Sequence, residues 1–205
     1  MTAGTGHFDI PEEDILRANL YDFLSITLAR PPGQAVLDRC AGLEGDATPL
    51  GEAVQALARI ASSTSPRAAE REFNGLFIGL GRGEVLPYAS YYMTGFLNEK
   101  PLSVLRNDMA RLGITRAPNV FEPEDNIASL FEMMAGLILG RFGDPASLSA
   151  QRDFFNRHVG PWAEHMFSDL EGAKSSVFYA AVGRIGRTFV GIEKEAFRMM
   201  AEATA

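Results

Sequence analysis

The chain has 205 residues, of which 46% are apolar and 22% are charged. A chain of this length and composition buries enough apolar surface to fold without a metal or disulfide, which excludes a disordered or collagen-like protein. The net charge of −7 argues against a general nucleic-acid-binding protein, because such proteins use basic surfaces to displace phosphate counterions. Cys40 is the only cysteine, which excludes an internal disulfide and fits a reducing cytoplasm.

Neither a secretory leader nor a transmembrane helix is expected. The first fourteen residues, MTAGTGHFDIPEED, have no early Lys or Arg and no apolar run. The most apolar stretch, from Leu130 to Gly140, is too short to span a bilayer and contains Glu132. We therefore expect a soluble cytoplasmic protein with no stable membrane insertion.

Helical periodicity dominates the chain. The first predicted helix covers residues 12–30, where apolar residues recur at steps of three and four behind an acidic first turn. Helices are predicted to begin after Thr48 and Ser65, because each places a capping hydroxyl before a proline. No segment alternates like a strand, so we predict an all-α protein, a helical bundle of about ten helices. The other predicted helices lie at about 49–62, 66–79, 102–112, 126–140, 147–158, 161–171 and 176–202.

Two stretches break this periodicity. Residues 79–95 are rich in glycine and aromatic residues, and residues 113–123 contain two prolines and no apolar period. We expect the second stretch to connect an N-terminal part, residues 1–115, through a hinge loop, residues 116–124, to a C-terminal part, residues 125–205. The parts are also compatible with one compact domain, and an exposed hinge permits a monomer or a domain-swapped dimer.

The common catalytic motifs GxSxG, HExxH, GKS/T and CxxC do not occur in the sequence. His158 and His165 are seven residues apart, but Gly160 and Pro161 between them argue against one helix that carries both. We expect these histidines to be satisfied surface or half-buried residues, and we expect no metal site.

The glycines at positions 79, 81 and 83 resemble a dinucleotide loop only in part. Glu84 stands where the GxGxxG fingerprint requires its third glycine, and no strand precedes the loop. We expect turn glycines and no bound cofactor. Binding of a mononucleotide, a guanine nucleotide in particular, stays open as an alternative, without a motif that cradles phosphates.

Acidic residues cluster at positions 122–125. Glu122, Glu124 and Asp125, with Glu132 further on, could supply the paired carboxylates of acid–base catalysis. Glu124 and Asp125 also fall at the predicted start of a helix, where Asp is the expected cap. Capping within a solvated acidic loop is favoured, and a small nucleotide-hydrolysing enzyme is the alternative.

Two apolar helix faces flank these loops. One precedes the glycine-rich loop and the other follows the hinge. Core packing is the favoured interpretation of such faces, and an apolar groove for a partner peptide is the alternative. The faces consist of Phe73, Leu76, Phe77 and Leu80, and of Ile127, Leu130, Phe131, Met134 and Ile138.

Four ordered blocks resemble the TorD/DmsD family of redox-enzyme maturation chaperones, which is related more distantly to NarJ. The resemblance implies an all-helical fold whose N- and C-terminal halves are joined by a hinge, and a function without catalysis. Such chaperones bind the twin-arginine leader, and sometimes the body, of the catalytic subunit of a molybdopterin-dependent oxidoreductase. They hold it in the cytoplasm until its cofactor is inserted and then release it for export. The blocks are FNGLFIGLGRGEVLPYASYYMTG (73–95), PLSVLRNDMARLGI (101–114), EPEDNIASLFEMMAGLI (122–138) and QRDFFNRHVGPWAEHMFSDL (151–170).

The resemblance also implies which positions bind the leader. Asn126 stands where the family usually has His, and Asn cannot acquire a charge near neutral pH, so a release step that depends on protonation there is not expected. The aromatic-x-x-Leu-Phe motif falls on Phe73, Leu76 and Phe77, and the loop proline falls on Pro87 beside Tyr88. The hinge motif Glu-Pro-x-Asp-His falls on Glu122, Pro123, Glu124, Asp125 and Asn126.

A twin-arginine leader has two adjacent guanidinium groups followed by an apolar stretch. Glu122, Glu124 and Asp125 are expected to pair with the arginines through charge-assisted hydrogen bonds. The apolar stretch is expected in a groove around Phe77 and Leu130. The alternative within the family is a chaperone of a leaderless cytoplasmic molybdoenzyme, as NarJ-type proteins are.

Overall fold

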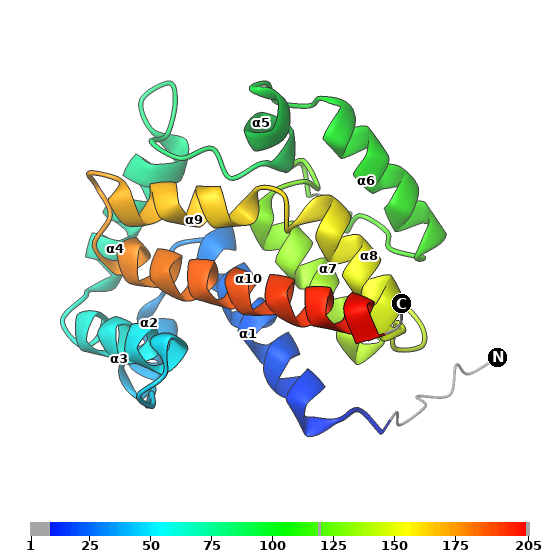
Figure 1. The fold of residues 1–205 in the computed structure, drawn as a ribbon. Helices are drawn as coiled ribbons and strands as arrows, with labels where there is room; N and C mark the ends of the chain where they lie inside the picture. The colour runs from blue at the N-terminus through cyan, green and yellow to red at the C-terminus, as the bar shows by residue number, and fades with distance from the viewer. Residues whose placement is uncertain (1–8, 119, 204–205) are drawn as a thin grey trace.

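Ten α-helices and one π-helical turn form the described part of the chain, and no β-strand occurs within it (Figure 1). This computed structural model describes residues 9–118 and 120–203. The all-α prediction is confirmed. In chain order the elements are α1 (Glu12–Ala29), α2 (Gln34–Ala41), α3 (Pro49–Ala61), α4 (Pro66–Phe73), the π-helical turn (Asn74–Ile78), α5 (Ala89–Thr94), α6 (Lys100–Arg111), α7 (Ile127–Leu139), α8 (Leu148–His158), α9 (Ala163–Gly172) and α10 (Phe178–Ala203).

The starts of α3 and α4 follow the capping logic read from the sequence. The Thr48 hydroxyl accepts a hydrogen bond from the backbone N–H of Gly51 at 3.0 Å, and a proline follows in the first turn. The Ser65 hydroxyl does the same for Ala68 at 3.3 Å. Both predicted helix starts are confirmed, because each cap satisfies an N–H group that the helix itself leaves unpaired.

Two short helices were not expected from periodicity. α2 has eight residues and follows two prolines and a glycine, and α5 has six residues inside the stretch that was expected to be irregular. Leu37 and Cys40 of α2 are 1% and 2% exposed, so packing rather than helix propensity holds this element. The prediction that residues 79–95 lack helical structure is therefore wrong for Ala89–Thr94.

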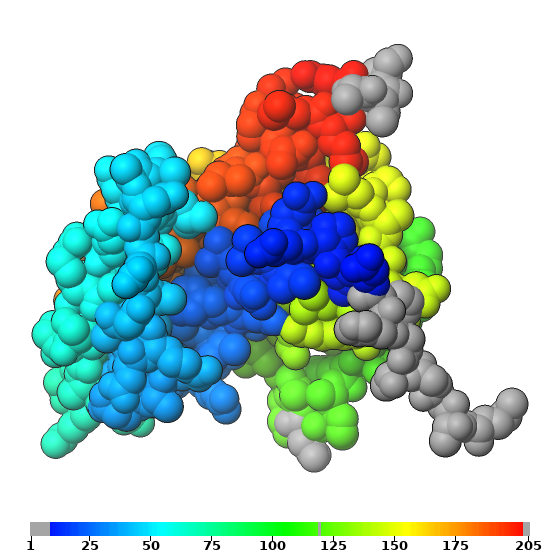
Figure 2. Space-filling view, turned by 90° about the horizontal axis from the view of Figure 1, so that it is seen from below, coloured from blue at the N-terminus to red at the C-terminus, as the bar shows by residue number. Residues whose placement is uncertain are grey.

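The helices pack around one apolar core that draws on both sides of the hinge loop. α1 lies along α7, and α10 lies between α9 and α3 (Figure 1). Tyr21 of α1 joins the C-terminal half, with its ring 5.1 Å from Phe131 and 4.6 Å from Phe189 between centroids. Seen from below, α1 in blue crosses the body beside the cyan α2–α3 region, while green residues of the hinge region stand out from the body (Figure 2). None of the described helices has the length and apolar character needed to cross a membrane.

Candidate functional site

The two irregular stretches of the sequence meet in space. Tyr88 forms an isolated antiparallel bridge with Asn126, and the backbone N–H of Ile127 donates to the carbonyl oxygen of Pro87 at 2.9 Å. Pro87 and Tyr88 are thereby held against the start of α7. The positions that the family resemblance named in the glycine–aromatic stretch and in the hinge motif are therefore direct neighbours.

Asp125 holds the two stretches together by its side chain. Its Oδ2 accepts a hydrogen bond from the backbone N–H of Ser90 at 2.8 Å, near the start of α5. The residue is 1% exposed, and its Oδ1 has no hydrogen-bond partner among the described residues. The Ser90 hydroxyl is also buried without such a partner. Asp125 thus positions the loop, and a ligand reaches its carboxylate only if the surrounding backbone moves.

Asn126 caps α7. Its side-chain oxygen accepts a hydrogen bond from the backbone N–H of Ala128 at 2.9 Å, and the residue is 9% exposed. The expectation that Glu124 or Asp125 provides this cap is wrong, because the helix begins one residue later, at Ile127. An Asn is as effective as an Asp at this position, since either offers an acceptor oxygen to the first turn.

Glu122 is the exposed acid of the hinge motif. The Tyr88 hydroxyl donates a hydrogen bond to its Oε1. Burial, and then the hydrogen bond to the Glu122 carboxylate and its charge, raise the pKa of Tyr88. A carboxylate at the surface is therefore anchored next to an aromatic ring from the other stretch, with Pro123 half-buried beside it.

Glu124 is the buried acid of the hinge motif. It is 8% exposed, and Arg106 of α6 donates to its Oε2 from Nε at 3.1 Å and from Nη2 at 2.9 Å. Burial alone would raise the pKa of Glu124, but the Arg106 hydrogen bonds and the charges of Arg106 and Arg116 outweigh it and the pKa is lowered. The carboxylate is therefore held ionised, which suits binding of a cation and opposes use as a general acid.

The aromatic-x-x-Leu-Phe motif has a structural role in this fold. Phe73 and Leu76 are 9% and 0% exposed, and half-buried Phe77 packs against Tyr179 at 5.4 Å between ring centroids. Leu130 of α7 is also 0% exposed. The expectation of an open apolar groove around Phe77 and Leu130 is therefore wrong, and the core-packing interpretation holds for these faces.

Accessible apolar side chains lie in the loops instead. Phe121 of the hinge loop is 88% exposed and Leu80 of the glycine-rich loop is fully exposed. Leu80 was expected on an apolar helix face, whereas Phe121 was not predicted, because loops lack the helical periodicity that reveals such faces. The exposed large apolar residues of the two stretches and their borders are Ile78, Leu80, Met93, Phe96, Leu97, Val120 and Phe121.

A small pocket opens beside the hinge motif. Its volume is about 130 Å³, and its charged lining consists of Arg116, Glu122, Glu124 and Glu132. Glu132 of α7 is exposed, and its side chain makes no hydrogen bond or salt bridge within the described part of the chain, although its charge acts on Arg141. The apolar lining comes from Met109, Ile114, Val120, Met133 and Phe142.

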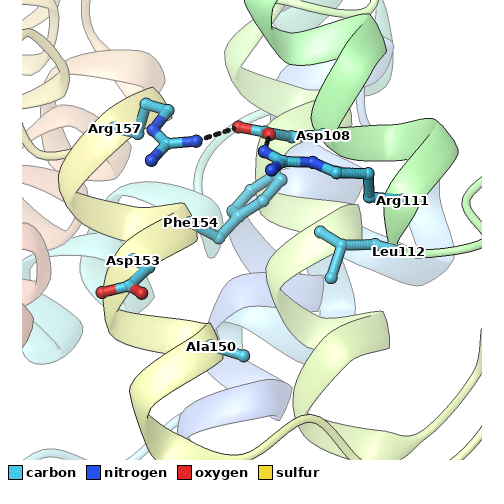
Figure 3. Close-up of a pocket in the computed structure, with 7 residues that line it drawn as sticks. All are labelled: Asp108, Arg111, Leu112, Ala150, Asp153, Phe154 and Arg157. Carbon is cyan, nitrogen blue, oxygen red and sulfur yellow. Dashed lines mark hydrogen bonds and ion pairs between the residues drawn. The ribbon is translucent and has the colours of Figure 1, made fainter.

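A larger pocket of about 300 Å³ lies between α6 and α8, where Arg111 and Arg157 approach Asp108 from two sides (Figure 3). The Oδ2 atom of Asp108 accepts from Arg157 at 2.9 Å and lies 2.7 Å from Nε2 of His158. Arg111 forms an ion pair with the same carboxylate. Burial, followed by the charges of Arg157 and Arg111, lowers the pKa of His158 to about 4. His158 is satisfied as expected, but it is buried, at 4% exposed, rather than half-buried or at the surface. No sequence pattern singled out Asp108.

A model of a protein family matches a part of the chain that includes both irregular stretches and the hinge motif. The family model described as the nitrate reductase delta subunit matches residues 43–168. The chain belongs to the nitrate reductase delta subunit family. The resemblance to TorD and its relatives, drawn from four sequence blocks, is confirmed by this match and by similar proteins.

Several curated relatives carry the name chaperone protein TorD. The protein of this name from Vibrio cholerae (strain O395) is 29% identical over 140 residues, which cover 65% of this chain and 64% of the relative. The chain thus spans about two thirds of the length of this relative. The one from Vibrio atlanticus is 26% identical over 201 residues, which cover 87% of this chain and 93% of the relative.

A solved structure shares the fold. It is a crystal structure of an Archaeoglobus fulgidus protein described as a redox enzyme maturation protein. The TM-score is 0.54 at 20% identity, over 92% of this chain and 99% of the other. The helical fold is therefore shared with that protein across nearly the whole length of both chains.

Proposed function

We propose that this protein is a cytoplasmic chaperone that binds the twin-arginine leader of the catalytic subunit of a molybdopterin-dependent oxidoreductase. It holds the subunit until the cofactor has been inserted and then releases it for export. Family membership and relatives named chaperones support the maturation role. The observation that carries leader binding is the junction of Tyr88 with the acidic hinge motif, where ionised carboxylates adjoin exposed apolar side chains.

The chemistry of the leader matches this junction. Arginine binds carboxylates through two parallel hydrogen bonds, and Glu122 and Glu124 lie within one pocket. The apolar stretch of a leader would lie on the exposed residues of the two loops, with Val120 and Phe121 next to the acids. Of the positions that the family resemblance names, Glu122 is exposed and Phe77, Tyr88 and Pro123 are half-buried. The buried ones are Phe73, Leu76, Pro87, Glu124, Asp125 and Asn126.

Site-directed photocrosslinking tests this placement. A photoreactive phenylalanine analogue is introduced at Phe121 and, as a matched control, at Val177, which is 63% exposed in the turn before α10. The probe is a leader peptide of a molybdoenzyme from the same genome, together with a version in which both arginines are glutamine. Crosslinking from position 121 to the arginine peptide, with little from position 177 or to the glutamine peptide, is the expected result.

Two other results would point elsewhere. Equal crosslinking from both positions would contradict the hinge loop as the binding site. Crosslinking of position 121 only to a folded, leaderless molybdoenzyme subunit would support the NarJ-like alternative in place of leader binding.

A further inference from the structure

Two guanidinium groups of the chain itself already surround the buried acid of the hinge motif. Arg106 binds Oε2 of Glu124 through two nitrogen atoms, at 3.1 and 2.9 Å. Arg116, in the hinge loop, lies 3.7 Å from Oε1 of the same carboxylate and donates from Nη2 to the backbone oxygen of Glu122 at 2.6 Å. The two carboxylate oxygens of Glu124 therefore face one arginine each.

The two arginines are held very differently. Arg106 belongs to α6 and makes a forked contact, which is the strong arrangement for an arginine and a carboxylate. Arg116 makes one long ion pair and one bond to a backbone carbonyl, and it lies outside the helices, in an exposed segment of the hinge loop. Displacing Arg116 therefore costs less than displacing Arg106.

Arg116 is also the only cation among the residues that line the small pocket beside the hinge motif. The other charged residues of this lining are Glu122, Glu124 and Glu132. With Arg116 removed, three acidic side chains would face a space of about 130 Å³ whose remaining lining is mostly apolar, with Thr115 and Ser129 as its two hydroxyl-bearing residues. An arginine side chain suits such a space, because its guanidinium pairs with carboxylates while its methylene stem contacts apolar groups.

We propose that Arg116 is a built-in competitor of the leader: its guanidinium occupies the place at Glu124 that a leader arginine takes, and leader binding displaces it. This inference rests on the proposed function and adds its regulation. Exchange of one guanidinium for another keeps the buried Glu124 paired throughout, so neither state carries the penalty of an unpaired buried charge. A leader with two arginines replaces Arg116 at Glu124 and offers its second guanidinium to Glu122 or Glu132.

The competitor also favours arginine over lysine. A lysine ligand has one compact ammonium group and cannot bind a carboxylate through two nitrogen atoms. Its contact with Glu124 would therefore be weaker than that of an arginine. Without Arg116, Glu124 would be paired with Arg106 alone and its Oε1 would accept either cation, whereas with Arg116 beside it Oε1 accepts only the better ligand. Arg116 therefore increases the selectivity for arginine over lysine and lowers the affinity for either ligand.

The test compares Arg116→Gln with Arg59→Gln by fluorescence anisotropy. Both changes remove one positive charge, but Arg59 lies on α3, away from the hinge. The probe is a labelled peptide with two adjacent arginines followed by an apolar stretch, with twin-lysine and twin-glutamine versions. Arg116→Gln is expected to bind the arginine peptide about two- to fivefold more tightly than the natural protein, as removal of a partly exposed ion pair predicts. Arg59→Gln is expected to bind with unchanged affinity or only slightly more tightly, because it makes the same change in net charge far from the site.

Two further readouts separate competition from a general change in the loop. The affinity of Arg116→Lys is expected to lie between those of the natural protein and Arg116→Gln, because it keeps the charge but cannot pair with Glu124 and bond the Glu122 carbonyl from two separate nitrogens. In arginine side-chain NMR spectra, peptide binding is expected to shift the Arg116 Nε–Hε signal toward that of a solvated arginine and to leave Arg106 protected.

The outcomes are distinguishable. If the natural protein binds the arginine peptide and Arg116→Gln binds it equally or more weakly, the competitor role is overturned and leader binding stands. If neither protein binds the arginine peptide better than the glutamine peptide, both the competitor role and the proposed function are overturned.

Discussion

His158 sits in a cationic environment despite its contact with a carboxylate. Its Nε2 lies 2.7 Å from Asp108, while Arg157 binds the same oxygen of that carboxylate and Arg111 pairs with it as well. Two positive charges thus offset the one negative charge nearby. The neutral imidazole donates to Asp108, and burial together with the charges of Arg157 and Arg111 lowers the pKa of His158 to about 4.

The lowered pKa of His158 predicts that the folded protein becomes less stable in acid. Between pH 6.5 and about 4 the unfolded chain binds a proton at His158 that the folded protein does not, so the free energy of unfolding decreases as the pH falls through this range. The loss approaches about 3 kcal/mol at 1.36 kcal/mol per pH unit. Urea titrations at several pH values check it: His158→Gln is expected to flatten the dependence, and the exposed His165→Gln to leave it unchanged. Parallel curves for all three proteins would contradict the account.

Glu72 is a second residue whose role no local pattern reveals. Its carboxylate accepts hydrogen bonds from the backbone N–H groups of Val177, Phe178 and Tyr179, at 2.6, 3.1 and 2.7 Å. A side chain of α4 therefore caps α10 from about a hundred residues away in sequence. Sequence patterns predict capping only by neighbouring residues, and Glu72 is separated from Val177, Phe178 and Tyr179 by more than a hundred positions.

Loss of this cap has a predictable cost. Glu72→Ala removes the acceptor for three N–H groups and is expected to lower the free energy of unfolding by about 1–2 kcal/mol, as for a lost helix cap. Glu70→Ala, on the exposed side of the same helix, serves as the control and is expected to change it by less than about 0.5 kcal/mol. Chemical denaturation followed by circular dichroism measures both, and equal values would show that Glu72 does not cap α10.

At the scale of elements, α4 does not end in a simple cap but widens into the π-helical turn Asn74–Ile78. Gly79 ends this turn with φ of +61°, and a Cβ there would lie 2.0 Å from the backbone oxygen of Arg82. The turn leads into the glycine-rich loop, which continues to Pro87 and Tyr88. Its geometry therefore sets where the glycine–aromatic stretch meets the hinge motif.

Gly79 is accordingly expected not to tolerate a side chain. Gly79→Ala combines a left-handed backbone with a backbone clash and is expected to cost about 2 kcal/mol or more. Gly172→Ala is the control, because a Cβ at the end of α9 meets nothing within 4 Å. Thermal unfolding compares the two. A Gly79→Ala protein as stable as the control would mean that the turn can relax.

Most elements could be predicted from local sequence, and the failures have a common cause. Thr48, Ser65 and the apolar periods locate the long helices because capping and amphipathicity act over a few residues. The short helices α2 and α5 could not be predicted in this way, because contacts with residues distant in sequence stabilise them. The candidate site shows the same division: its motif positions were identified by resemblance, while the partners Arg106 and Arg116 became visible only in three dimensions.

At the scale of the whole molecule, residues before and after the hinge loop share one core. Tyr21 of α1 contacts Phe131 and Phe189, and α3 packs on α10. The hinge loop therefore crosses the surface of a continuous body. A loop of this kind can rearrange around a ligand without separating the core, which is compatible with the proposed binding and release of a client.

The net charge of −7 gives the molecule a long-range preference for basic peptides. Leader binding is therefore expected to weaken as ionic strength rises, mainly through slower association. Stopped-flow measurements at low and high salt check this expectation. An association rate that does not depend on salt would argue that the acidic hinge takes no part in the encounter.

The central claim is that this protein guards a molybdoenzyme subunit before export. The most direct measurement is affinity purification of the tagged full chain from its native host, grown with and without oxygen, followed by mass spectrometry of the bound proteins. The account predicts recovery of one molybdoenzyme catalytic subunit whose twin-arginine leader is uncleaved. Recovery of no molybdoenzyme subunit under either condition would contradict it.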